Sequence, residues 1–133
     1  MENNFRRKAT SVSMINYHIV ICPKYRRKIF LIPGVEDRFK ELVRQVCEQN
    51  DFDILALECQ IDHCHLFINV PPTVSAAKVV QQIKLGTSHP LMNEFKELSK
   101  AVSLWTRSYF ASTAGNVSSD TIKRYIELQK KRG

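Results

Sequence analysis

The spacing of apolar and polar residues along the 133-residue chain predicts five short strands. Each is a run rich in Val, Ile, Phe or Tyr that ends near proline, glycine or charged residues, as is typical of strands. The alternation is strictest in the fourth run, "HCHLFINV", which ends at Pro71 and Pro72. The predicted strands are residues 13–25, 27–33, 51–60, 63–70 and 107–115.

Three helices are predicted between and after these strands. Residues 34–50 carry apolar side chains at spacings of three and four, with charges between them. A second helix begins after Ser75, whose hydroxyl suits an N-cap, and reaches Gly86, where we expect a break before residues 89–98 resume it. The third covers residues 120–131.

The resulting order, β-β-α-β-β-α-β-α, indicates an α+β fold. Strands that alternate with helices favour one sheet covered on one face by helices, as in ferredoxin-like folds. A chain of this length fits one domain, residues 1–133. Residues 1–10 are polar and basic, and we expect them to be flexible.

Charge indicates the kind of partner. Lysine and arginine number 20 against 13 acidic residues, which gives a net charge of +7 and a pI near 9.4. Clustered positive charge on a small domain favours a polyanion, most often nucleic acid, with an ordinary basic domain as the alternative. The clusters lie at residues 6–8, 24–28 and 130–132.

Cysteine usage and hydropathy indicate the compartment. The four cysteines lie inside apolar stretches, and no CxxC pair occurs, which fits buried thiols in a reducing cytosol. The N-terminus has no apolar signal core, and no run reaches the roughly 18 apolar residues of a membrane span. We therefore expect a cytoplasmic protein without a membrane partner.

Two histidines in the fourth strand are the first candidate for chemistry. Side chains at i and i+2 of a strand share a face, and the opposite face of this strand is uniformly apolar. The two imidazoles stand roughly 6.5–7 Å apart at the backbone and can lean onto one ion. The face expected to be open carries His63, His65, Phe67 and Asn69.

Two other interpretations of this pair remain open. Both histidines can be ordinary surface residues, or they can join Cys59, which has the same parity, in a zinc thiolate site. The lack of a second close cysteine weighs against structural zinc, which usually has four nitrogen or sulfur ligands. A cation held by two imidazoles keeps open positions, and Mg²⁺ or Mn²⁺ would need oxygen ligands as well.

The last predicted helix carries a second candidate. Tyr125 and Gln129 lie on the same helical face as Ile122 and Ile126. That face can be a plain core stripe, but a buried amide needs a partner. If the face docks on the histidines instead, the Tyr125 hydroxyl can attack a phosphorus and the Gln129 carbonyl oxygen can reach the same cation. The neighbouring cations, Lys123 and Arg124, then hold phosphates or simply face solvent.

Four blocks of sequence in this order resemble one family. They are "YHIVICPKYRRKIF", "DHCHLFINVPP", "KVVQQIKLGTS" and "LWTRSYFASTAGNVSSDTIKRYIELQ", which together run from about Ile15 to Gln129. The chain looks like the single-tyrosine transposases of insertion sequences that move as single-stranded DNA, members of the HUH (histidine–hydrophobic–histidine) superfamily. One departure is Cys64, where the family usually has a larger aliphatic residue; cysteine still packs as a small hydrophobe.

The resemblance implies a ferredoxin-like or RRM-like core and a homodimer. It implies that His63, His65 and Gln129 bind Mg²⁺ or Mn²⁺ and that Tyr125 becomes linked to a DNA 5′ phosphate. It further implies composite active sites, in which the tyrosine helix of one subunit completes the histidine site of the other, and single-stranded DNA substrates with hairpin ends. Asp62 matches as well, and we expect it to orient a histidine.

With this resemblance, the basic residues are predicted to contact DNA phosphates. Tyr25, Phe67 and Trp105 are candidates for stacking on DNA bases, although a tryptophan such as Trp105 is more typical of a core or dimer contact. A non-catalytic RRM-like nucleic-acid-binding module is one alternative, although no aromatic pair of the RNP type is visible on the strands. A domesticated relative, or a replication or conjugation nickase, is another. Besides Lys123 and Arg124, the predicted phosphate contacts are Lys24, Arg26, Arg27, Lys28 and Lys84.

Overall fold

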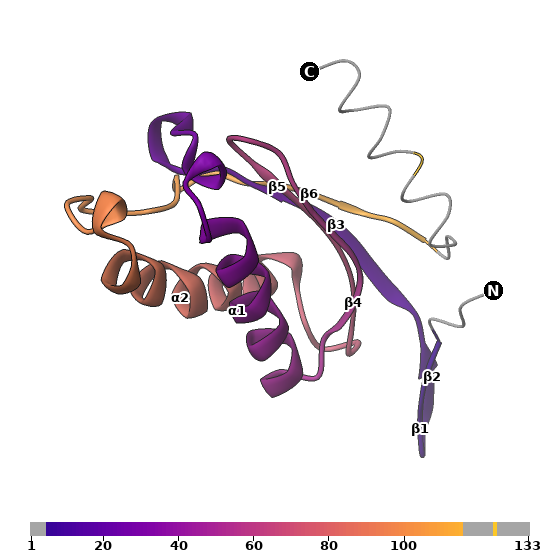
Figure 1. Cartoon of the computed structure of the whole chain (residues 1–133). Helices are drawn as coiled ribbons and strands as arrows, with labels where there is room; N and C mark the ends of the chain where they lie inside the picture. Colours follow the sequence, from indigo (N-terminus) through magenta and orange to yellow (C-terminus); the bar gives the residue numbers. More distant parts are fainter. Residues whose placement is uncertain (1–4, 116–123, 125–133) are drawn as a thin grey trace.

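The computed structural model describes residues 5–115 and Arg124 (Figure 1). Arg124 is helical and exposed. The predictions for Lys123, Tyr125 and Gln129 fall outside the described residues.

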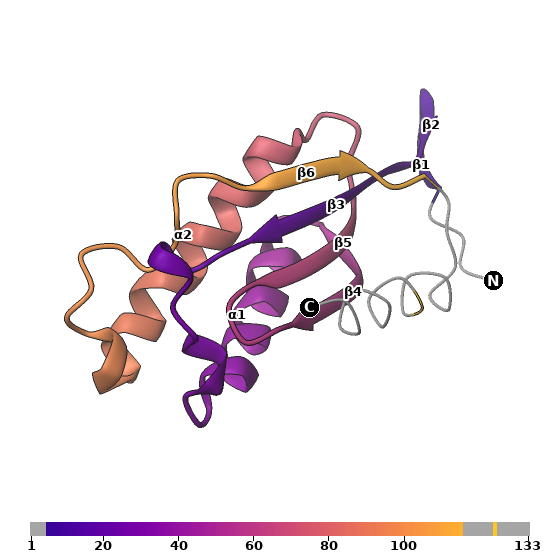
Figure 2. The same ribbon diagram turned by 90° about the horizontal axis from the view of Figure 1, so that it is seen from above.

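A four-stranded antiparallel sheet forms one layer and two helices form the other. The strand order is β4-β5-β3-β6, and every neighbouring pair is antiparallel. Both helices lie on the same face of the sheet (Figures 1 and 2). The chain order β3-α1-β4-β5-α2-β6 with this strand order is ferredoxin-like, as the sequence predicts. The bounds are β3 Ile15–Ile21, α1 Val35–Gln49, β4 Asp53–Cys59, β5 Cys64–Val70, α2 Ala76–Glu94 and β6 Phe110–Thr113.

A small hairpin precedes the sheet. Strand β1, Arg6–Lys8, pairs with β2, Ser11–Ser13, so part of the segment expected to be flexible has regular structure. The Arg6 guanidinium anchors the hairpin, because its Nε donates a 2.6 Å hydrogen bond to Oδ1 of Asn69 at the end of β5. Arg6 also forms ion pairs with Asp51 and Asp53.

The strand predicted over residues 27–33 is wrong. The chain forms two short 3₁₀ turns instead, η1 at Lys24–Arg26 and η2 at Ile29–Leu31. Two successive non-glycine residues, Tyr25 (φ 64°) and Arg26 (φ 50°), adopt the left-handed conformation just after Pro23, and this turns the chain out of the sheet. The apolar run is buried all the same, because Ile29 and Phe30 join the core from a turn.

The break predicted at Gly86 is also wrong, since α2 runs without interruption from Ala76 to Glu94 and includes Pro90. The glycine serves packing rather than a bend, because a Cβ at this position would clash with Cγ2 of Val46 on α1. Ser75 does cap the helix, accepting a 3.1 Å hydrogen bond from the Lys78 amide.

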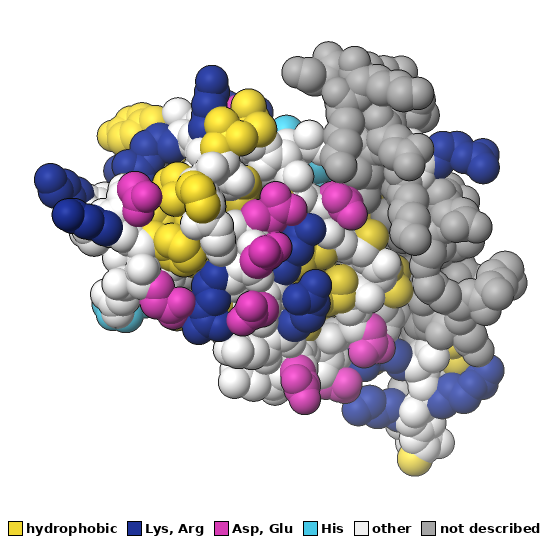
Figure 3. All heavy atoms as spheres, viewed as in Figure 1, with side chains coloured by type: hydrophobic (Ala, Val, Ile, Leu, Met, Phe, Trp, Pro, Cys, Tyr) yellow, Lys and Arg dark blue, Asp and Glu magenta, His cyan; other side chains and the backbone are white. Residues whose placement is uncertain are grey.

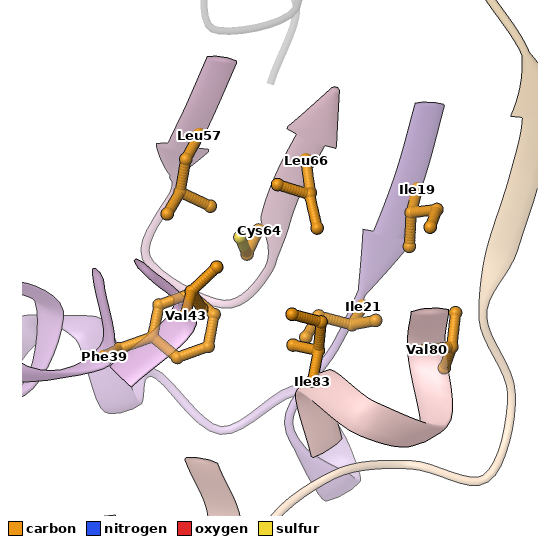
Figure 4. A pocket seen from close by; sticks show the side chains of 9 residues that line it. All are labelled: Ile19, Ile21, Phe39, Val43, Leu57, Cys64, Leu66, Val80 and Ile83. Atoms are coloured by element: carbon orange, nitrogen blue, oxygen red, sulfur yellow. The ribbon is translucent and has the colours of Figure 1, made fainter. Parts of the chain in front are cut away.

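The hydrophobic core fills the space between the sheet and the helices. Among the described residues, it contains a cavity of about 10 Å³, at the lower limit for a single water (Figure 4). None of the helices in the described part of the chain has the length and apolar character needed to cross a bilayer. The residues that line the cavity are Ile19, Ile21, Phe39, Val43, Leu57, Cys64, Leu66, Val80 and Ile83.

Candidate functional site

The two predicted ligands meet at the start of β5. His65 lies on this strand, and His63 lies in the loop just before it. Their ring centroids are 5.1 Å apart, and the rings are inclined at 73° to each other. The His63 side chain is 24% exposed, whereas the whole His65 residue is only 5% exposed. The pair therefore has one imidazole at the surface and one inside, and the predicted open face is in fact buried at His65.

The His63 ring is oriented by a carboxylate. Its Nδ1 lies 2.8 Å from Oδ1 of Asp62, and because a carboxylate only accepts, Nδ1–H is the donor. Arg26 donates to both Asp62 oxygens, at 3.2 Å and 3.3 Å. The bond from Arg26, followed by that from His63, holds the pKa of Asp62 below its usual range. An ionised Asp62 thus keeps a proton on Nδ1, so that the lone pair of the neutral form of this ring is on Nε2.

The His65 ring has a different neighbour, another histidine. His18 on β3 places its Nε2 3.0 Å from Nδ1 of His65. The His18 ring also stacks on Phe67, with centroids 4.2 Å apart and planes within 3°. The sequence pattern alone does not indicate a role for His18. The feature that identifies it is the pairing of β3 with β5, which sets His18 opposite Phe67. His18 therefore lies on the same face of the sheet as His65.

The buried histidines are held neutral. Burial, followed by the charges of His63 and His18, lowers the pKa of His65 to about 4. Burial likewise lowers the pKa of His18. At neutral pH, both rings therefore have one protonated nitrogen and one lone pair, and the neutral form is the one that binds metals.

These donors fit part of a divalent metal site. Two imidazoles whose Nδ1 atoms donate hydrogen bonds to neighbours can, in their neutral forms, offer Nε2 lone pairs to one ion. Within the described residues, no group of three His, Cys, Asp or Glu side chains could hold a metal ion. Further oxygen ligands would have to complete the site. Among described residues, the carboxylate of Glu58 lies opposite His65 in the register of β4 and β5.

The structure argues against Cys59 as a zinc ligand. Cys59 pairs with Cys64 in the ladder, and both belong to the core that faces the helices. The turn between β4 and β5 interrupts the alternation of side chains between the two faces of the sheet. The even spacing of Cys59 and His63 in the sequence therefore does not place the two side chains on the same face. Cys64 points away from the imidazoles, and burial raises the pKa of its thiol well above the ordinary value.

The predicted phosphate contacts lie in different surroundings. Arg26 is held by Asp62, and Lys84 donates to the backbone carbonyl oxygens of Thr106 and Ser108 just before β6. In the view of Figure 3, lysine and arginine side chains are interspersed with acidic ones. Arg26 and Lys84 therefore stabilise the local structure through contacts within the protein. A role in binding DNA stays a prediction for all seven basic residues.

The stacking candidates separate by exposure. Tyr25 is 83% exposed, whereas Phe67 and Trp105 are buried. Trp105 donates from its indole nitrogen to Oγ1 of Thr87 at 3.0 Å, inside the core. Trp105 is therefore a core residue, and Tyr25 is the candidate that remains accessible.

Comparison with known proteins identifies the relatives of this chain. Residues 11–129 match the family described as "Transposase IS200 like". The transposase for insertion sequence element IS200 of Salmonella typhimurium is 33% identical over 121 residues, which cover 86% of this chain and 78% of that protein. The ISDra2 transposase TnpA of Deinococcus radiodurans is 27% identical and covers 89% of this chain and 86% of its own length.

Solved structures agree. A putative transposase from Deinococcus radiodurans, at 27% identity, has a TM-score of 0.75 over 93% of this chain and 97% of its own. A REP-associated tyrosine transposase bound to a REP hairpin shares the fold at 11% identity, with a TM-score of 0.59 over 90% of this chain and 67% of its own. The chain therefore belongs to the IS200-like family of single-tyrosine HUH transposases and is an enzyme that acts on DNA in transposition.

Proposed function

We propose that this transposase cleaves and rejoins single-stranded DNA at the hairpin-marked ends of an insertion sequence through a 5′-phosphotyrosine. The observation that carries the proposal is the pair of imidazoles, His63 and His65, with each Nδ1 hydrogen-bonded to a neighbouring side chain. Such a pair is suited to one divalent cation and has no evident use in a module that only binds nucleic acid.

His63 and His65 bind the cation, Mg²⁺ or Mn²⁺, through their Nε2 atoms, and Gln129 is the third protein ligand. Asp62 supports this role, because it holds His63 in the required tautomer. When bound, the cation supplies Lewis acidity toward a phosphoryl oxygen of the DNA. Both ions prefer oxygen donors, which is why an amide oxygen is expected beside the imidazoles.

Tyr125 is the nucleophile. Its phenolic oxygen forms a bond to the phosphorus, the bond from phosphorus to the 3′ oxygen breaks, and the departing strand ends in a 3′ hydroxyl. The phenolic proton leaves in the same step, and the departing 3′ oxygen takes up a proton. Because the phosphodiester is conserved as a phosphotyrosine, attack by a 3′ hydroxyl reverses the step and rejoins DNA.

The DNA partner is single-stranded with hairpin ends, and the enzyme acts as a homodimer. The net charge of +7 supports a polyanionic substrate, and a structural relative has been solved bound to a REP hairpin. In the dimer, the tyrosine segment of one subunit completes the histidine site of the other. Lys24, Arg27 and Lys28, in and beside the two turns that follow β3, are candidates for phosphate contacts.

The covalent step is tested by replacing the nucleophile. Tyr125→Phe should form no covalent DNA adduct on a denaturing gel while still binding hairpin DNA in a mobility-shift assay. Tyr109→Phe, which changes an exposed tyrosine before β6, is the matched control and should keep the adduct. An adduct retained by Tyr125→Phe would refute the assignment. If the wild type binds hairpins without forming any adduct, the chain is a binding module instead.

The composite site is tested by mixing subunits. Tyr125→Phe and His63→Ala chains are each expected to be inactive alone, and the mixed dimer should recover cleavage at one of its two sites. Failure of the mixture to recover activity, with dimers demonstrated by light scattering, would contradict assembly across the interface.

A further inference from the structure

His18 occupies a buried position directly behind the proposed ligand His65. It lies near the middle of β3, is 7% exposed, and points to the same face as the imidazole pair. Phe67 is stacked flat against it, and Phe110 of β6 meets it edge-on with centroids 5.6 Å apart. Two aromatic neighbours therefore limit rotation of the His18 ring and fix where its Nε2 points.

The contact between His18 and His65 joins two ring nitrogens, Nε2 and Nδ1, at 3.0 Å. In a contact of this length between two neutral imidazoles, one nitrogen donates its proton and the other accepts it. If His65 donates from Nδ1, its Nε2 carries a lone pair. If His18 donates instead, the lone pair of His65 is on Nδ1 and its Nε2 carries a proton, which excludes a metal ion there.

We propose that His18 is a positioning residue that accepts the Nδ1–H of His65 and thereby holds His65 in the metal-binding tautomer and orientation. The inference rests on the proposed function, because it assumes that His65 binds the cation through Nε2. It assigns to His18 the part that Asp62 plays for His63, so each ligand has its own orienting partner.

The chemistry of the two partners follows their surroundings. Asp62 lies near the surface, where the Arg26 guanidinium stabilises its charge. A carboxylate at position 18 would be buried against the ring of Phe67, and burial of a charge in such surroundings is costly. A neutral imidazole supplies an acceptor at the same place without a buried charge. Because a neutral imidazole can donate or accept, the proton between His18 and His65 has two possible positions, and the fixed orientation of the His18 ring must select between them.

Two substitutions at this position separate positioning from packing. His18→Phe keeps a flat ring against Phe67 but removes the acceptor nitrogen. His18→Gln gives up the ring but offers a carbonyl oxygen near the former Nε2. A role limited to packing predicts that His18→Phe behaves like wild type, whereas a positioning role predicts that His18→Gln does.

The test titrates the full chain with Mn²⁺ alone, without DNA, and follows free Mn²⁺ by electron paramagnetic resonance. His18→Phe should weaken Mn²⁺ binding by about 10–100-fold, the range expected when a ligand's hydrogen-bond partner is lost. His18→Gln should restore most of this loss. Equal Mn²⁺ affinity in His18→Phe and wild type would overturn the inference.

A second readout concerns the tautomer and needs no metal. Nitrogen-15 correlation spectra of the metal-free wild type should show His65 protonated at Nδ1, and His18→Phe should gain the Nε2–H form. A wild type in which His65 carries its proton mainly on Nε2 would overturn the proposal, even if His18→Phe fails to fold. If the wild type binds no Mn²⁺, the metal role in the proposed function fails, whereas normal binding in both wild type and His18→Phe defeats only this inference.

Discussion

Strand β5 has two faces that are equally buried but chemically opposite. Toward the helices, Ile68 and Val70 are 0% exposed among aliphatic neighbours. On the other face, His65 and Asn69 are 5% and 2% exposed, yet they carry polar groups that must find partners. Burial of apolar area is non-directional, whereas each polar contact has a required donor, acceptor and angle.

The polar face meets this requirement with side chains from distant parts of the chain. Asn69 donates to Oδ1 of Asn16 at 2.7 Å, and Asn16 donates to the carbonyl oxygen of Gly115 at 2.6 Å. Arg6 donates from Nε to Oδ1 of the Asn69 side chain. The apolar face therefore holds the fold together, and the polar face fixes orientations. Substitutions on the two faces should therefore impair different properties of the protein.

The largest effect is expected on activity, from the polar face. His63→Ala should abolish DNA cleavage because it removes a metal ligand, and the loss should exceed the about 10–100-fold typical of an orienting partner. EDTA should have the same effect on the wild type, reversed by excess Mg²⁺ or Mn²⁺. Cleavage is measured as the appearance of shortened single strands on a denaturing gel. His89→Ala, on α2, is the matched control; cleavage that persists unchanged in EDTA would contradict the metal role.

The next effect is on stability, from the apolar face. Ile68→Ala should lower the free energy of unfolding by about 2–5 kcal/mol, because it empties part of a fully buried site. The fraction that remains folded should still cleave DNA. The measurement is urea denaturation followed by circular dichroism, together with activity per folded molecule.

Asn69→Ala is the comparison on the polar face of the same strand. It leaves Arg6 and Asn16 without one partner each and should cost about 1–3 kcal/mol. A greater loss of stability for Asn69→Ala than for Ile68→Ala would reverse the proposed division between the two faces.

The last expected effect is a pH dependence of the stability of the metal-free chain. His65 has a folded pKa of about 4, against about 6.5 when unfolded, so the unfolded chain binds more protons between these values. The free energy of unfolding should be fully present above pH about 6.5 and decline as the pH falls to about 4. His18 acts in the same direction. His65→Gln in EDTA should show a shallower decline, and an identical slope for the variant and wild type would exclude this origin.

The apolar face was the more predictable from sequence, because alternation and helical spacing are local signals. These local signals predict the positions of strands β3, β4, β5 and β6, of both described helices and of the N-cap at Ser75. Local patterns failed where tertiary contacts decided the outcome. Ile29 and Phe30 look like strand residues but are buried from a turn, and Gly86 looks like a break but is a point of close contact between helices.

The site was predictable only in part. The spacing of His63 and His65 is visible in one strand, and Asp62 is adjacent to it in sequence. His18 lies 47 residues from its partner, and only the register of β3 against β5 brings the two together. Cys59 is suggested as a ligand by the alternation of side chains between the two faces of a strand, but the turn before β5 interrupts that alternation. The parts played by Tyr125 and Gln129 stay predictions.

The central claim is that one divalent cation binds between two imidazoles whose Nδ1 protons are held by Asp62 and His18. Pulsed electron paramagnetic resonance of Mn²⁺ bound to protein with ¹⁵N-labelled histidine measures this coordination directly. We expect couplings from two histidine nitrogens in the wild type and from one in His63→Ala. A wild-type spectrum without histidine couplings, at Mn²⁺ concentrations that support cleavage, would contradict the account.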